Sequence, residues 1–201
     1  FRILPVLAVT SPEKRCGKTT LLEILGGLTN KTLLASNITP SAIFRTIEKH
    51  RPCLLIDEAD TFLKDNNELR GILNSGHTAK SAFVIRTNTE TLEPERFSTW
   101  GPKVISLIGA LPDTLSDRSV AVKMERKTVF EKVKKVSLGF DRNHLPLRRK
   151  CKRWALDNSE SLKTAVPGIP ETGNDRASDN WLPMICIADL AGGEWPDKIR
   201  K

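Results

Sequence analysis

Two short stretches constrain this chain more than any other feature: SPEKRCGKTT at residues 11–20 and PCLLIDEAD at residues 52–60. The first ends like the phosphate-binding pattern G-x-x-x-x-G-K-S/T, because Gly17, Lys18 and Thr19 match its last three positions. Such a loop turns backbone N–H groups toward an anion, brings a lysine to the β- and γ-phosphates, and offers a hydroxyl to Mg²⁺. The stretch therefore predicts a site for ATP and Mg²⁺.

The loop departs from the pattern at one position, where Pro12 replaces the first glycine. Proline removes one backbone N–H and fixes φ at about −65°. Because Pro12 stands at the entry of the loop, we expect the site to work if the entry turn uses negative φ. The loop residues expected at the nucleotide are Lys14, Arg15, Cys16, Gly17, Lys18, Thr19 and Thr20.

The second stretch supplies acids for the same site. Asp57 and Glu58 follow an apolar run that is typical of a buried strand. Asp57 can hold Mg²⁺ with Thr19, and Glu58 can polarise the attacking water. Solvated acids are common at strand ends, and that alternative stays open for either acid alone. The two motifs together, on the first and third expected strands, favour a working nucleotide site.

Strand-like and helix-like stretches alternate over the first 60 residues. Buried strands are expected at residues 3–10 and 52–60, a short strand at 31–37, and helices at 20–28 and 40–51. This alternation is typical of an α/β fold in which helices cover both faces of a parallel sheet.

The pattern changes after residue 60. We expect a helix at 66–76, a β-hairpin insertion at about 80–102, an apolar strand at 103–111, a short helix at 112–118 and a last strand at 119–124. Beyond residue 128 the strand signal stops, and basic helical stretches surround a Pro/Gly-rich loop at 166–175. The sequence therefore predicts a core at residues 1–128 and a helical lid at 129–201.

The charge of the chain suits a polyanionic partner. The net charge is +8, and residues 132–153 contain nine Lys or Arg against one acid. For a charge run alone, a solvated helix face is the favoured interpretation. Four scattered cysteines show no metal-binding spacing, and no apolar run is long enough to span a membrane. Phe1 opens the sequence, so we interpret the chain as a fragment of a longer cytoplasmic protein.

The chain resembles AAA+-type P-loop ATPases. It is most similar to a poorly characterised ATPase domain family of phages and mobile elements, whose members often accompany primase-like modules in replication proteins. The matching stretches are SPEKRCGKTTLLEIL, LLIDEAD, LRGILNSGH, LPDTLSDRSVAVKM and DRASDNWLPMICIADLAGGEWP. The resemblance implies a bacterial or phage-infected cell, a homo-oligomer such as a hexameric ring, and a C-terminal lid.

The resemblance also assigns roles to two arginines. Arg118, just before the last strand, matches an arginine finger that acts on ATP held by the next subunit. Arg176 opens a lid helix where a second sensor arginine usually touches the γ-phosphate. A polar sensor usually ends the fourth strand, but Gly109 and its neighbours offer none if that strand is 103–111. Asn88 is the rival if the strand of the hairpin is the fourth instead.

In helicases of superfamily 3, an inserted hairpin grips DNA in the pore. By this resemblance Lys80, Arg86 and Arg96 are candidate phosphate contacts, and a peripheral hairpin with solvated charges is the alternative. The function implied is an ATP-driven DNA helicase or translocase acting on single-stranded or forked DNA. A nucleotide-dependent switch or loader, a DNA-binding module with structural nucleotide, and a monomeric kinase remain open.

Overall fold

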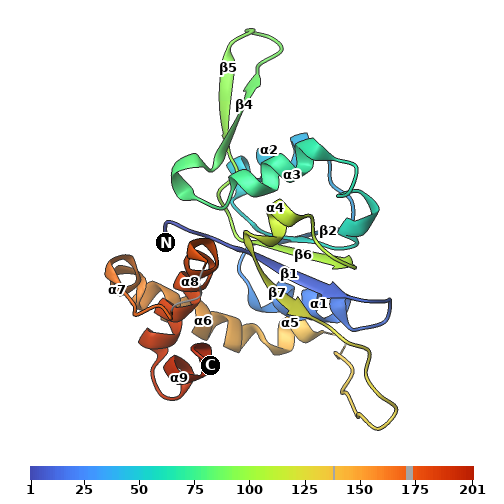
Figure 1. Ribbon diagram of the computed structural model, residues 1–201, viewed down its shortest axis with the longest axis vertical. Helices are drawn as coiled ribbons and strands as arrows, with labels where there is room; N and C mark the ends of the chain where they lie inside the picture. Colours follow the sequence, from blue (N-terminus) through green and yellow to red (C-terminus); the bar gives the residue numbers. More distant parts are fainter. Residues whose placement is uncertain (138, 171–173) are drawn as a thin grey trace.

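A five-stranded parallel sheet forms the centre of the molecule (Figure 1). The computed structural model describes residues 1–137, 139–170 and 174–201. The spatial order is β2-β3-β6-β1-β7, and every neighbouring pair is parallel. The strands are β1 (Val6–Ser11), β2 (Thr32–Ala35), β3 (Cys53–Ile56), β6 (Lys103–Ile108) and β7 (Ser119–Lys123). The predicted α/β class with a parallel sheet is confirmed.

Helices cover both faces of this sheet (Figure 1). On one face α2 (Pro40–His50) and α3 (Asn67–Ser75) bury their apolar sides against β3 and β6. On the other face α1 (Lys18–Leu28) packs Leu22 against strand residues that include Val9. Both sides of β3 are therefore buried, which explains its continuous apolar sequence.

Local signals in the sequence set the helix starts. The Thr39 hydroxyl accepts a hydrogen bond from Ala42 N, and Pro40 fills the first position of α2. The Asn66 side chain caps α3 by accepting from Leu69 N at 2.9 Å. Ser, Thr and Asn are preferred at such positions because they satisfy N–H groups that have no partner within the helix.

The first strand starts later than the sequence predicts. β1 begins at Val6, whereas Ile3 makes an isolated bridge with Thr78. Pro5 separates the two segments, and proline has no N–H to donate to a neighbouring strand. Leu4 N instead donates to His77 O at 2.9 Å.

The predicted hairpin insertion is present and stands outside the central sheet. β4 (Phe83–Thr87) and β5 (Pro94–Ser98) form a separate antiparallel pair that projects from the body in Figure 1. The place between β1 and β3 is taken by β6. The fourth strand of the sheet is therefore β6, and the alternative that placed Asn88 at its end is wrong.

The remaining elements are short or helical. β7 is preceded by α4 (Asp113–Ser116) and followed by an extended segment without regular structure, residues 124–137, which we call the basic arm. The described residues after it form the helices α5 (Phe140–Asn143), α6 (Leu145–Asp157), α7 (Ser159–Thr164), α8 (Asp175–Ala191) and α9 (Trp195–Ile199). The predicted core and lid boundary at 128 stays a prediction, and three residues of the predicted loop 166–175 lie outside the described chain. Within the described residues, no helix is both long and apolar enough to cross a membrane.

Candidate functional site

The loop after β1 lies at the carboxyl edge of the sheet. Gly17 precedes α1 with φ of 83°, a left-handed conformation that favours glycine, and Lys18 is the first residue of the helix. Lys18 Nζ donates to Ser11 Oγ at 2.6 Å, so the ammonium folds back over the end of β1. The bond is to a neutral hydroxyl, and Lys18 can therefore exchange it for an anion at little electrostatic cost.

The backbone of the loop is arranged as the sequence requires. Pro12, Glu13 and Lys14 all have negative φ, and the left-handed residues are Arg15 and Gly17. This meets the condition under which Pro12 is tolerated. Cys16 is buried, and its thiol lies against the carbonyls of Glu13 and Lys14. In the described chain, no backbone hydrogen bond uses the N–H groups of residues 14–17. These donors are available to a ligand.

The acids after β3 meet the loop. Thr19 Oγ1 donates to Asp57 Oδ2 at 3.0 Å, which joins residues 38 positions apart. The other carboxylate oxygen accepts from Glu58 N at 2.9 Å, and Glu58 has φ of 53°. The Glu58 side chain is exposed at the same edge. The structure thus brings Lys18, Thr19, Asp57 and Glu58 to one edge, as the sequence predicts.

The Thr19 and Asp57 pair fits a Mg²⁺ site. Mg²⁺ takes oxygen ligands and is usually held by one or two carboxylates, with substrate phosphates and waters completing the shell. Among the described residues there is no group of three or more His, Cys, Asp or Glu that could hold a metal alone. A hydroxyl and a carboxylate oxygen 3.0 Å apart suit an ion that is shared with a nucleotide.

Sequence reasoning missed Asp60, the last residue of the same acidic stretch. Asp60 Oδ1 accepts from Ile108 N at 3.0 Å and so ties the turn after β3 to the end of β6. Gly109 follows with φ of 88° and donates its N–H to Ser11 O. No polar side chain stands at positions 109–111, in agreement with the sequence. Asn88 lies at the hairpin turn, where its side chain accepts from Glu90 N.

The two arginines assigned by resemblance lie at the opposite, amino edge of the sheet. Arg118 immediately precedes β7, and its carbonyl accepts from Val6 N at the start of β1. Its guanidinium donates to Thr114 O at 2.6 Å. A six-residue strand such as β1 separates the two edges by about 17 Å. Arg118 is therefore remote from Lys18 of its own chain, and its role as an arginine finger stays a prediction.

The position of Arg176 differs from the prediction. Its guanidinium pairs with Asp117 at 3.1 Å, so Arg176 lies beside Arg118 and not above the loop. The cause is α8, which packs on β7 near the amino edge. Asp117 thus pairs with the lid arginine. Both arginines line one cavity of about 450 Å³ with His77 and Asp179.

A buried amide that the sequence did not reveal fixes this arrangement. Asn180 of α8 lies 2.8 Å from His77 Nε2 and donates to Asp117 O at 2.9 Å. Burial lowers the pKa of His77, the bond to Asn180 raises it, and the positive charges of Arg118 and Arg176 lower it further. The stretch DRASDNW placed Asn180 on a helix, but only the fold shows its partners.

The hairpin residues proposed as DNA contacts are largely engaged with the protein. Arg86 pairs with Glu68 at 2.7 Å, and the Arg96 guanidinium lies 3.6 Å from the centre of the Phe83 ring. Lys80 is exposed in the short turn η2 (Ala79–Ser81) before the hairpin. The charged residues of the hairpin turn and of β5 are three acids, Glu90, Glu93 and Glu95, and one base, Arg96. The far end of the hairpin is therefore acidic, which does not favour phosphate contacts there.

Comparisons with known proteins show similarity over different shares of the chain. Residues 123–201 match a family described as a protein of unknown function (DUF3631). An "Uncharacterized 28.9 kDa protein in xis 5'region" of Saccharopolyspora erythraea is 37% identical over 78 residues, or 38% of this chain and 29% of that protein. A solved structure described as "The A form apo structure of NrS-1 C terminal region-CTR" is similar with a TM-score of 0.44 and 14% identity. The similarity covers 87% of this chain and 38% of the other, so the chain spans well under half of either protein.

Proposed function

We propose that this chain is an AAA+-type domain that binds and hydrolyses ATP with Mg²⁺ and, as an oligomer, moves along DNA. The observation that carries the proposal is the meeting of Lys18, Thr19 and Asp57 at the carboxyl edge. Ligands of open α/β sheets bind outside the carboxyl ends of the strands, where helices on opposite faces diverge. Here α1 leaves β1 toward one face and α2 lies on the other.

Each residue has a role in this proposal. Free N–H groups of the loop and the Lys18 ammonium bind the phosphates, and Thr19 with Asp57 holds Mg²⁺. Bound Mg²⁺ would neutralise charge that develops on the transferred phosphoryl group. Glu58 orients and polarises the attacking water. The strand order and the remote position of Arg118 support the finger role, in which Arg118 serves the nucleotide of the next copy.

A nucleotide-dependent switch or loader is the second candidate. It is favoured by the end of β6, where Gly109 stands and no polar side chain is available to sense the γ-phosphate. A switch binds ATP at the same loop but turns it over slowly and without response to DNA.

Lys18→Ala tests the site that both candidates share. Removing the ammonium should abolish ATP binding while the circular dichroism spectrum stays that of the parent. Lys49→Ala, at an exposed lysine on α2, is the control and should bind ATP normally. Unchanged ATP affinity in Lys18→Ala would refute the site. Turnover that rises with protein concentration and with single-stranded DNA selects the motor over the switch.

A further inference from the structure

The positive charge of the molecule is concentrated in one part of the chain. Residues 124–157 contain eleven Lys or Arg against four Asp or Glu, a net of +7 out of a total of +8. This part comprises the basic arm, α5 and α6. No residue of α6 is buried; Arg148 is half-buried, and the other Lys and Arg of this helix are exposed. Such a concentration is the electrostatic footprint of a polyanion-binding surface.

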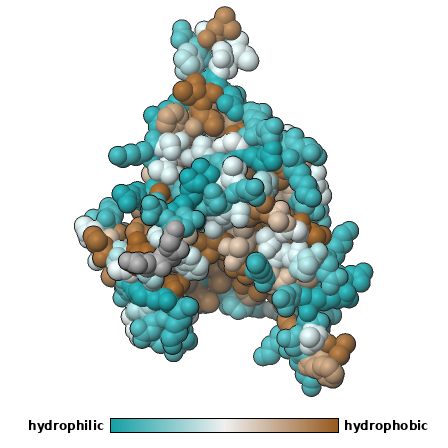
Figure 2. All heavy atoms as spheres, viewed as in Figure 1, coloured by the Kyte–Doolittle hydropathy of each residue, from teal (hydrophilic) through white to brown (hydrophobic). Residues whose placement is uncertain are grey.

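The basic arm ends in a defined apolar tip. Val129 and Phe130 are 92% and 91% exposed, so neither packs against the protein. Glu131 Oε2 accepts from Thr128 N at 2.7 Å, and Glu131 N donates to Thr128 O. The hydrogen bonds from Thr128 hold the pKa of Glu131 below its usual range. The turn presents both apolar side chains outward, and Figure 2 shows apolar atoms at this tip, at the lower right.

Cations surround the apolar tip. They lie on both sides of it in the chain: Arg126, Lys127, Lys132, Lys134 and Lys135. An exposed aromatic ring among lysines is the combination that binds single-stranded nucleic acid, because bases stack on the ring while the cations contact phosphates. A duplex keeps its base faces covered and cannot use the ring in this way. The hairpin β4–β5 offers the opposite charge, since acids dominate its far end.

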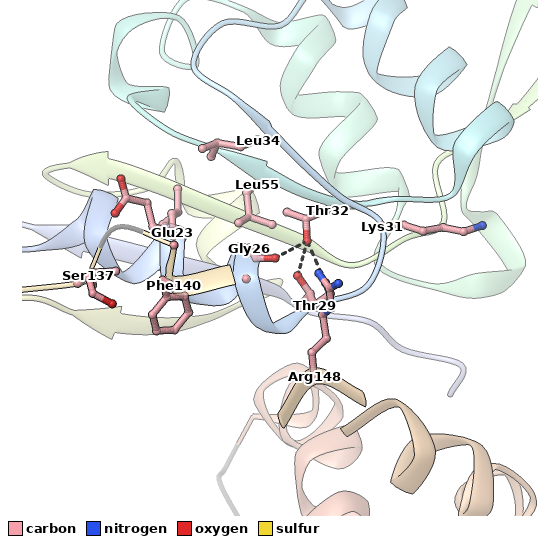
Figure 3. A pocket seen from close by; sticks show the side chains of 14 residues that line it. Glu23, Gly26, Thr29, Lys31, Thr32, Leu34, Leu55, Ser137, Phe140 and Arg148 are labelled. Atoms are coloured by element: carbon pink, nitrogen blue, oxygen red, sulfur yellow. Dashed lines mark hydrogen bonds between the residues drawn. The ribbon is translucent and has the colours of Figure 1, made fainter. Parts of the chain in front are cut away.

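The basic arm begins next to the loop after β1 and ends at a cavity that it shares with α6. At its start, Met124 Cε lies 3.6 Å from the position that a Cβ on Gly17 would take, and Arg126 pairs with Glu13 at 3.9 Å. At its end, Val136 and Ser137 line a cavity of about 580 Å³ together with Arg148 of α6. Figure 3 shows Arg148 reaching from α6 toward Thr29, which follows α1, and Thr32, the first residue of β2.

We infer that the basic arm binds single-stranded nucleic acid, with Phe130 stacking on a base and Lys132, Lys134 and Lys135 contacting phosphates. This inference rests on the nucleic-acid part of the proposed function and is independent of ATP turnover. It places the contact with nucleic acid on the basic arm, which lies beyond β7 at the opposite end of the molecule from the hairpin (Figure 1).

The test uses the chain of 201 residues and a fluorescent oligothymidylate of about 16 nucleotides, without nucleotide, at about 50 to 200 mM salt. Phe130→Ala should weaken binding about 5- to 150-fold and leave the salt dependence unchanged. The triple variant Lys132→Ala, Lys134→Ala, Lys135→Ala should lower the slope of log K against log salt by about 2. Phe130 is fully exposed, so its variant folds as the parent does.

Matched controls come from the hairpin. Leu92→Ala removes an exposed apolar side chain at its turn, and Lys80→Ala removes an exposed lysine at its base. Both should bind the oligonucleotide as the parent does. Weaker binding in these two variants, with parental binding in Phe130→Ala, would overturn the inference in favour of the hairpin.

Two further outcomes would also overturn it. One is a parent chain that does not bind the oligonucleotide. The other is a Phe130→Ala variant that sediments differently from the parent but binds the oligonucleotide with the same affinity. That result would mean that the apolar tip contacts a second copy of the chain. Lys18→Ala should keep full affinity for the oligonucleotide. If the ATP site is assigned wrongly, only the ATP-binding assay will show it. If the basic arm is assigned wrongly, only the oligonucleotide-binding assay will show it.

Discussion

The carboxyl and amino edges of the sheet differ in how their functional side chains are held. At the carboxyl edge, Lys18 is bonded to a neutral hydroxyl and the Glu58 carboxylate is exposed. At the amino edge, Arg118 donates to a carbonyl of its own chain and Arg176 pairs with Asp117. The first edge is poised for a small ligand within one chain. At the second edge, both guanidinium groups are bound to acceptors of the same chain.

The largest effect is expected from Arg118, and it tests whether the amino edge acts on another copy. Arg118→Ala should bind ATP normally but lose turnover by about 10³- to 10⁵-fold, the usual contribution of an arginine finger. Lys18→Ala should be inactive because it binds no ATP. Mixing the two inactive variants should restore turnover, since a site with Lys18 can receive Arg118 from its neighbour.

Two results would show that Arg118 at the amino edge does not act on the ATP of another copy. One is the absence of any recovery in mixtures under conditions where the chains associate. The other is full activity of Arg118→Ala that does not depend on protein concentration, which would make Arg118 a helix-end residue bonded to Thr114 and nothing more.

Glu58→Gln tests the carboxyl edge with a nearly isosteric change. The amide cannot polarise water as a carboxylate does, so turnover should fall about 10²- to 10⁴-fold while ATP affinity is kept. Glu90→Gln, at the exposed turn of the hairpin, is the matched control and should hydrolyse ATP as the parent does. Parental turnover in Glu58→Gln would reduce Glu58 to a solvated acid at the end of a strand.

The carboxyl edge could be predicted from the sequence because its signals are local. Gly17, Lys18 and Thr19 are consecutive, and Asp57 follows a run of apolar residues that can only be a buried strand in this context. Parallel strands then bring their carboxyl ends to the same edge. The Thr19 to Asp57 bond confirms that reasoning.

The amino edge could not be predicted in the same way. The partners of Arg176 and Asn180 lie 59 or more positions away, at Asp117 and His77, and no periodicity in the sequence records such pairs. The resemblance placed Arg176 over the loop because it gave the order of elements but not the packing of α8. Similarly, nothing in the sequence of the hairpin shows that Arg86 pairs with Glu68.

Lys103 gives a pH-dependent test of the amino edge, where β6 begins. Its side chain is buried, and burial lowers its pKa to about 8, although its ammonium donates to Gly101 O at 2.9 Å. An unfolded lysine titrates near 10.4, so the folded state disfavours the charged form. The cost is complete below pH ~8 and disappears above pH ~10.4. The free energy of unfolding should therefore gain up to about 3 kcal/mol over this range.

The measurement compares the parent with Lys103→Met by urea unfolding at pH about 7 and about 10. Methionine has no charge to bury, so its stability relative to the parent should be greater at the lower pH. Lys49→Met, at an exposed position, should show no such change. An equal difference at both pH values would mean that Lys103 reaches water in the folded protein.

Asn180→Ala should have the smallest effect, and it tests whether α8 fixes the amino edge. The substitution leaves His77 Nε2 and the carbonyl of Asp117 without their buried partner, which should lower the free energy of unfolding by about 1–3 kcal/mol. Urea unfolding measures the loss, and Asn143→Ala, at an exposed position of α5, is the control. If both variants were equally stable, Asn180 would not hold α8 against Asp117. Arg176 would then be free to leave Arg118, and the difference between the two edges would reduce to Arg118 alone.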